Sequence, residues 1–118
     1  MPHEIARLAK ALEPRFAVHE DASLAATMMV RALRAQFSHA IKGEERRRYL
    51  AALDRLPENS FPIPTLKFGT PQGAGTHWHV TFTDGRADYP CSRRFVTEGQ
   101  ASDYASDFLM RWGEISGP

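Results

Sequence analysis

The sequence predicts an α+β domain on three observations: helical periodicity through the first half, an alternating hairpin pattern in the second half, and a last helical segment. Prolines mark a stiff linker over residues 57–64. We expect one domain over 1–118, with a helical part, 1–56, and a sheet plus helix, 65–118. The predicted fold is three N-terminal helices, a small antiparallel sheet of about three strands built around a hairpin, and a C-terminal helix.

The first half contains three segments with apolar side chains at helical spacing. The first covers residues 3–13, and the second covers residues 21–42 or begins two residues later. Gly43 is placed to cap the end of the second helix, because glycine adopts the left-handed conformation with which many helices end. Residues 44–56 predict a third helix, since glutamates occupy its first turn, where the helix dipole favours negative charge.

Two alternating segments in the second half predict a β-hairpin. Polar and apolar residues alternate over 76–83 and again over 86–92, and Asp84-Gly85 between them suits a two-residue primed turn. That register pairs Phe82 with Ala87, Val80 with Tyr89, and Trp78 with Cys91. These six residues form an apolar face. The opposite face is polar and contains His77, His79, Thr81, Asp88 and Ser92.

The segments on either side of the hairpin complete the sheet and the last helix. Residues 65–69 predict a short strand, and the glycine-rich residues 70–75 predict a flexible loop. Pro90 has no N–H to donate to a neighbouring strand, so its strand is expected at an edge of the sheet or at a bulge. Residues 97–100 have the Thr-x-x-Gln pattern of a capping box, which begins a helix that ends at Gly113.

The composition is that of an ordinary globular protein and excludes several classes. The chain is 42% hydrophobic and 25% charged with a net charge of +1, unlike a disordered tail or a strongly basic nucleic-acid-binding protein. No apolar run approaches the roughly 20 residues of a membrane span, and the N-terminus lacks the pattern of a secretory signal. A lone cysteine, Cys91, excludes an intramolecular disulfide. We therefore expect a cytoplasmic protein that does not bind membranes.

His77 and His79 are the first candidates for catalysis or metal binding, because residues two apart on a strand point to the same side. Asp88 lies diagonal to His79 in the predicted register, within side-chain reach. The set is incomplete, so we expect neither a metal nor another cofactor. Residues 79–82, His-Val-Thr-Phe, resemble one of the paired His-x-Thr motifs of the two-histidine phosphoesterases, whose second motif the sequence lacks. A small metal-dependent or phosphoesterase-type enzyme is one alternative, with these three residues as weak catalytic candidates.

Basic residues gather in the helical half, where residues 1–56 carry ten Lys/Arg against seven Asp/Glu. If the second and third helices pack side by side, part of this charge forms one basic face, and nucleic-acid binding through it is a second alternative. The candidate binding residues are Arg31, Arg34, Lys42, Arg46, Arg47, Arg93 and Arg94. The three arginines at 46–48 do not form a patch alone, because consecutive helical residues spread over about 200°.

Residues 62–112 resemble in layout the C-terminal part of a double-stranded-RNA-binding domain, with strands, a hairpin, and a helix that carries Ala101 and Ala105. In that family the last helix begins with a lysine-rich cluster that contacts phosphates. This chain has Thr-Glu-Gly-Gln at 97–100 instead. The resemblance therefore implies topology and not the RNA contact.

The function that the sequence favours is a small non-catalytic binding module (an adaptor, regulator or inhibitor) that acts on another protein; a homodimer is also open. No catalytic set is complete, and the smaller half is rich in large aromatic residues: Phe61, Phe68, Trp78, Tyr89, Phe95, Tyr104 and Trp112. A small sheet buries only part of so much aromatic surface. We therefore expect an exposed aromatic cluster, which is typical of an interface.

Overall fold

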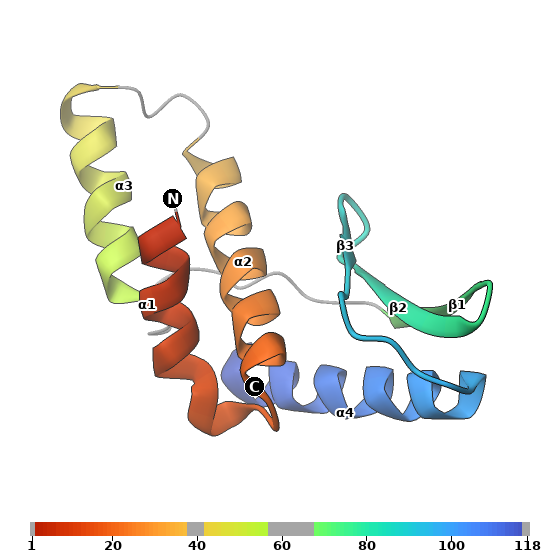
Figure 1. The fold of residues 1–118 in the computed structure, drawn as a ribbon. Helices are drawn as coiled ribbons and strands as arrows, with labels where there is room; N and C mark the ends of the chain where they lie inside the picture. Colours follow the sequence, from red (N-terminus) through yellow and green to blue (C-terminus); the bar gives the residue numbers. More distant parts are fainter. Residues whose placement is uncertain (1, 38–41, 57–67, 117–118) are drawn as a thin grey trace. The chain divides into compact units, whose positions relative to one another are not determined.

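The structure is a computed structural model that describes residues 2–37, 42–56 and 68–116. The chain divides into two compact units, residues 1–64 and 65–118. The predicted fold class is confirmed: three helices, a three-stranded antiparallel sheet and a last helix follow one another along the chain (Figure 1). The predicted linker, 57–64, lies outside the described residues. In the described part of the chain, no helix is both long and apolar enough to cross a membrane.

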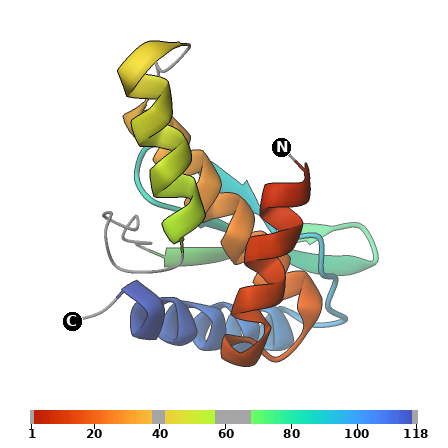
Figure 2. The same cartoon turned by 90° about the vertical axis from the view of Figure 1, so that its left-hand side faces the viewer.

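The first unit is helical. Its elements are α1 (Pro2–Leu12), the 3₁₀ turn η1 (Glu13–Arg15), α2 (His19–Gln36) and α3 (Gly43–Arg55). α1 and α3 both pack against α2 (Figures 1 and 2). The buried apolar side chains include Leu8, Leu12, Ala22, Ala26, Met29, Leu33, Tyr49 and Leu53. Arg7 of α1 donates a hydrogen bond to the Leu53 carbonyl at 2.9 Å, near the C-terminal end of α3, where a helix favours a cation.

The second helix is shorter than the sequence predicts. It ends at Gln36 rather than at residue 42, and the Phe37 N–H bonds to the Arg34 carbonyl at 3.1 Å as the helix ends. Gly43 has a φ of 73°, but it lies at the start of α3 and does not cap α2. Phe37 packs its ring against Tyr49, with ring centroids 5.8 Å apart. This contact is a physical reason for the early end, because it draws Phe37 toward α3.

The second unit is a sheet with one helix. Its elements are β1 (Phe68–Ala74), β2 (His77–Thr83), β3 (Asp88–Pro90) and α4 (Glu98–Ser116), and the strand order is β1-β2-β3. α4 lies along one face of the sheet, where it contacts β1 and β2 (Figure 1). The buried side chains here include Val80, Phe82, Tyr89, Cys91, Ala101, Tyr104, Ala105, Phe108 and Trp112. Phe82 stacks on Phe108, with ring centroids 4.5 Å apart, so the centre of this core joins β2 to α4.

The predicted glycine-rich loop is in fact most of strand β1. The two-residue turn of the sheet is at Gly75-Thr76, with Gly75 at a φ of 70°. Gly69 lies under Phe82, where an added Cβ would come within 2.8 Å of the ring. Gly73 lies under the Trp78 indole, where an added Cβ would make an ordinary contact with the ring at 3.6 Å. Glycine is depleted in strands because it has no side chain to pack, and here aromatic rings on β2 fill that space.

The predicted register of the 76–92 hairpin is wrong: the partners of β2 are shifted by two residues along β3 and by four at Trp78, which lies opposite Phe95 rather than Cys91. Tyr89 lies opposite Phe82 rather than Val80, because residues 84–87 form the turn instead of Asp84-Gly85 alone. Asp84 stabilises this longer turn: its Oδ1 accepts hydrogen bonds from the N–H groups of residues 86 and 87, both at 2.8 Å. A shift by an even number of residues keeps strand side chains on their faces, so Val80, Phe82, Tyr89 and Cys91 still pack inward, whereas Ala87 lies in the turn.

Three further predicted features of this unit have different outcomes. The capping box is confirmed: Gln100 N donates to Thr97 Oγ1 at 3.1 Å, and Thr97 N donates to Gln100 Oε1 at 3.4 Å. Gly113 lies inside α4, which continues to Ser116. Pro90 is on β3, an edge strand, as its missing N–H requires.

Candidate functional site

A hydrogen-bonded group of polar side chains lies on the face of the sheet opposite α4. Gln72 on β1 accepts a hydrogen bond from Thr81 Oγ1 at 2.9 Å, and its Oε1 lies 3.1 Å from His79 Nε2. His77 is on the same face, because it is two residues from His79 on β2, and the two ring centroids are 6.3 Å apart. Both histidines are half-buried. The prediction that the two histidines share a face is therefore confirmed, whereas Gln72, the partner of His79, lies on a strand and not in the predicted loop.

Asp88 does not join this group. The observed register places Asp88 opposite Thr83 rather than Thr81, two pairs further from His79 than the predicted register did. Within residues 2–37, 42–56 and 68–116, no three His, Cys, Asp or Glu side chains are close enough to hold a metal ion. The hydrogen-bond partner of His79 is the neutral Gln72 amide rather than a carboxylate that would assist a histidine base.

Each edge strand of the sheet carries a proline, which removes one outward-facing backbone N–H. Val80 accepts a hydrogen bond from Cys91 N at 2.8 Å, so the backbone of Val80 faces the β3 side. Pro71 lies opposite Val80 on β1, and its nitrogen therefore points to the outer edge. Pro90, opposite Thr81, points outward on β3 by the same alternation. Because neither nitrogen carries a hydrogen, the sheet is a poor template for an added strand.

Arg93 and three aromatic residues form a second group, which we call the aromatic–arginine cluster (Trp78, Arg93, Phe95 and Tyr104). Trp78 and Phe95 exchange two backbone hydrogen bonds of 2.7 and 2.8 Å. The Phe95 and Tyr104 ring centroids are 5.0 Å apart. The guanidinium of Arg93 lies 4.8 Å from the Tyr104 centroid and 5.3 Å from that of Phe95, within the range of a cation–π interaction.

Val96 stands beside this cluster and is 79% exposed. It occupies the position before the Thr97 cap, where an apolar side chain often packs against the first turns of the helix as a hydrophobic staple. Its exposure shows that the fold does not use it in that way. Arg94 is also exposed. The segment 93–96 therefore combines an arginine held on aromatic rings with an uncovered apolar side chain.

The expected exposed aromatic cluster is corrected in part. Tyr89, Tyr104 and Trp112 are buried, because α4 and the sheet cover them. Trp78 and Phe95 are half-buried. Phe61 and the side chain of Phe68 lie outside the described residues. Of the aromatic residues in this expected cluster that the structure describes, Trp78 and Phe95 are the two that reach solvent, and both belong to the aromatic–arginine cluster.

The candidate basic residues of the helical unit are exposed, and two of them diverge around α3. Arg46 and Arg47 are adjacent on α3 and so lie about 100° apart around the helix. Arg47 forms an ion pair with Glu44 at 2.7 Å, which neutralises part of its charge. Arg31 and Arg34 are exposed on α2, and Lys42, the N-cap of α3, is exposed as well.

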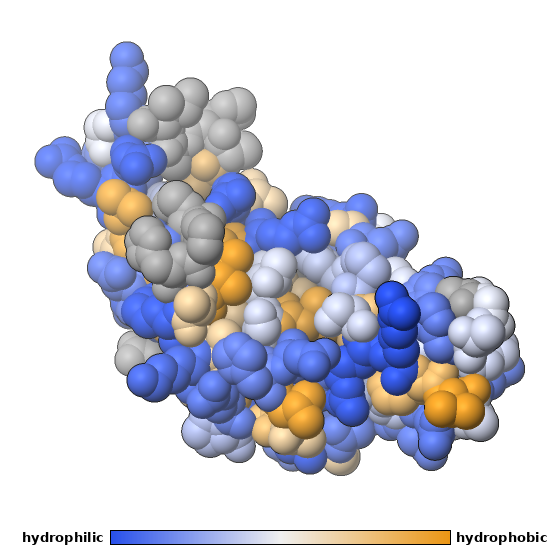
Figure 3. All heavy atoms as spheres, in the orientation of Figure 1, coloured by the Kyte–Doolittle hydropathy of each residue, from blue (hydrophilic) through white to orange (hydrophobic). Residues whose placement is uncertain are grey.

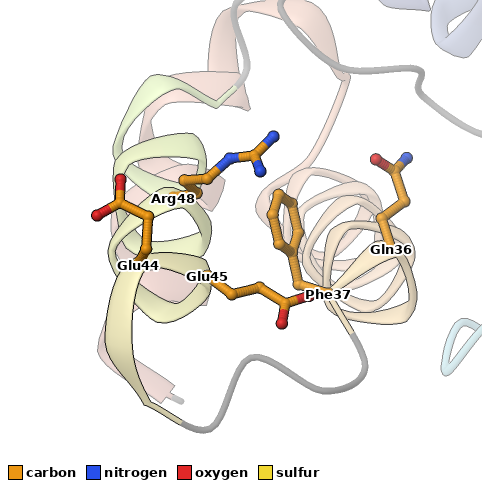
Figure 4. Close-up of a pocket in the computed structure, with 5 residues that line it drawn as sticks. All are labelled: Gln36, Phe37, Glu44, Glu45 and Arg48. Atoms are coloured by element: carbon orange, nitrogen blue, oxygen red, sulfur yellow. The ribbon is translucent and has the colours of Figure 1, made fainter.

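A pocket of about 540 Å³, which the sequence did not predict, lies between the end of α2 and the start of α3 (Figure 4). It is lined by Gln36, Phe37, Glu44, Glu45 and Arg48. Glu45 and Arg48 extend from α3 toward the Phe37 ring, whereas Glu44 is directed away (Figure 4). These side chains offer charge of both signs but no nucleophile with a base, so they do not supply a catalytic set.

On the face drawn in Figure 3, hydrophilic residues predominate, and hydrophobic residues form small separate spots. Among the described residues, the large apolar side chains that are exposed are Val18, Leu50, Val96 and Met110.

Comparisons of the chain with protein families, with curated proteins and with solved structures found no match.

Proposed function

We propose that the chain is a small non-catalytic binding module, an adaptor, regulator or inhibitor, that recognises another protein through the aromatic–arginine cluster and Val96. The observation that carries this proposal is the 79% exposure of Val96 beside an arginine held against two aromatic rings. Arginine and aromatic side chains dominate the energetic centres of protein interfaces.

The rigidity of the cluster supports the same proposal. Two backbone hydrogen bonds hold Phe95 to Trp78, and the Arg93 N–H donates to Cys91 Sγ at 3.2 Å. A surface that is already ordered loses little conformational entropy when a partner binds. The prolines on the edge strands favour recognition by side chains rather than by an added strand.

The alternatives have less support. The His77 and His79 face has no third ligand or acid–base partner among the described residues, which weighs against an enzyme. The ion pair of Arg47 and the separation of Arg46 and Arg47 around α3 weigh against a single nucleic-acid-binding face. We also propose that the module works in the cytoplasm, where a lone thiol such as Cys91 stays reduced.

Pull-downs from the native host with three forms of the chain test this proposal. Wild type is compared with Val96→Asp and with the His77→Ala/His79→Ala double variant. Val96→Asp preserves the fold, because the Val96 N–H still donates to Gln100 Oε1 at 3.1 Å and the side chain is exposed. We expect a protein partner to be lost from Val96→Asp and kept by the histidine variant. A partner kept equally by all three forms, or one released by nuclease, would contradict the proposal.

A further inference from the structure

We propose that His77 and His79 together bind one divalent transition-metal ion of the class that prefers imidazole, such as Cu²⁺ or Ni²⁺, on the polar face of β2. Neither residue has a role in the proposed protein interface, so this site is independent of it. The two imidazoles come from one central strand that is paired on both sides, which fixes their spacing.

Gln72 prepares His79 to act as a ligand. Its Oε1 accepts a hydrogen bond from Thr81 Oγ1, which orients the amide oxygen toward β2. Because that oxygen is an acceptor, His79 Nε2 at 3.1 Å is the donor and carries the ring hydrogen. The lone pair of a neutral His79 is then on Nδ1. Histidine ligands characteristically donate their other ring N–H to a carbonyl or carboxylate oxygen, and Gln72 supplies such an oxygen.

The two rings need a side-chain rotation to share one ion. Imidazole nitrogens bind such ions at about 2.0–2.1 Å, so two rings bound in cis to one ion have centres roughly 4.5–5 Å apart. The observed separation is 6.3 Å, and rotation of the His77 side chain toward His79 shortens it while the contact of His79 with Gln72 is kept. A cis arrangement of two nitrogens is available to Cu²⁺ and Ni²⁺, which bind nitrogen ligands tightly among the divalent first-row ions.

The site has two protein ligands, so water takes the remaining coordination positions. No third His, Cys, Asp or Glu joins the pair in the part of the chain that the structure describes. A closed structural zinc site needs four protein ligands, and the folding of a protein with such a site depends on the metal. We therefore infer an exchangeable surface site that forms on the folded sheet and is not needed for folding.

The test is a calorimetric titration of the EDTA-treated full chain with Cu²⁺, repeated with Ni²⁺. His77→Ala and His79→Ala should each weaken binding about tenfold or more, because a chelate becomes a single ligand. The matched control is His19→Ala, which removes a histidine of the helical unit whose Nδ1 lies 2.9 Å from Glu13 Oε1, and its affinity should stay within about twofold of wild type. Val96→Asp should also bind the metal like wild type.

Two measurements test whether Gln72 prepares His79 as a ligand: the metal affinity of Gln72→Leu and the tautomer of His79. Gln72→Leu keeps both imidazoles and should weaken binding about tenfold, the usual effect of losing a partner of a ligand. In metal-free wild type, nitrogen-15 NMR of the histidine rings should show hydrogen on His79 Nε2. Metal affinity unchanged in the His77→Ala/His79→Ala variant, or hydrogen found on His79 Nδ1 in wild type, would overturn the proposal.

Discussion

Replacement of Asp84 by alanine should destabilise the sheet unit by about 2 kcal/mol. Three donors reach this carboxylate: the N–H groups of Arg86 and Ala87, each 2.8 Å from Oδ1, and the Tyr89 hydroxyl, 3.2 Å from Oδ2. A hydrogen bond to a charged group contributes about 1.5–3 kcal/mol, but water reaches this turn and replaces part of what is lost. The total is therefore closer to one such bond than to three.

The pH dependence of the effect identifies its cause. Desolvation raises the pKa of Asp84, but hydrogen bonds from Ala87, Arg86 and Tyr89 outweigh it and hold the pKa below the ordinary value of 3.8. A lowered folded-state pKa means that the charged form stabilises the fold. This contribution is complete above the ordinary pKa and is lost as the pH falls through the lowered one. The difference between wild type and Asp84→Asn should therefore shrink below about pH 4.

Urea titrations followed by tryptophan fluorescence measure this effect, because Trp78 and Trp112 both lie in the sheet unit. The matched control is Asp88→Ala, an exposed aspartate of the same hairpin, which should change stability by less than about 0.5 kcal/mol. Equal stability of wild type and Asp84→Ala, or an Asp84→Asn difference that persists unchanged at pH 2, would refute the reasoning.

Three further predictions concern the core and the charged surface. Gly69→Ala should destabilise by about 1–3 kcal/mol, because its methyl would meet an aromatic ring at 2.8 Å. Gly113→Ala, in the last turn of α4 with open space around it, should stabilise by up to about 1 kcal/mol, and urea titrations compare the two. Cys91, which is 7% exposed, should react with a bulky thiol reagent far more slowly than a fully exposed cysteine does. Rapid labelling of the folded protein would show that Cys91 is not buried. Any nucleic-acid binding should be weak, lost on charge reversal of Arg31 and Arg34, and show a log–log salt slope near −0.9 per phosphate contact; tight, sequence-specific binding at physiological salt would contradict this.

The order of helices and strands could be predicted from the sequence, because apolar periodicity follows directly from which faces are buried. The faces of the hairpin were predictable for the same reason. Its register was not, because Asp-Gly suits a two-residue turn, and the preference of Asp84 for two backbone N–H groups at 86 and 87 decided the longer one. Local turn chemistry therefore prevailed over the more common hairpin signal.

The extent of strand β1 beyond residue 69 could not be predicted, because Gly69, Pro71 and Gly73 all disfavour a strand when considered alone. Its stability depends on Phe82 and Trp78 of the neighbouring strand, which fill the space above the glycines. The candidate sites could be predicted only in part for the same reason. The histidine pair followed from alternation, whereas its Gln72 partner depended on β1. The aromatic–arginine cluster depended on contacts between residues far apart in the sequence, which no local pattern shows.

Partner affinity and turnover, measured together in Val96→Asp and in His77→Ala/His79→Ala, test the central claim most directly. We expect Val96→Asp to weaken partner binding by roughly 2 kcal/mol, about thirtyfold, as for an interface hot spot. The histidine double variant should bind within a few-fold of wild type, and neither variant should lose a catalytic activity. A histidine variant that folds and binds the partner normally but loses a measurable turnover would show that the protein is an enzyme and that the binding-module account is wrong.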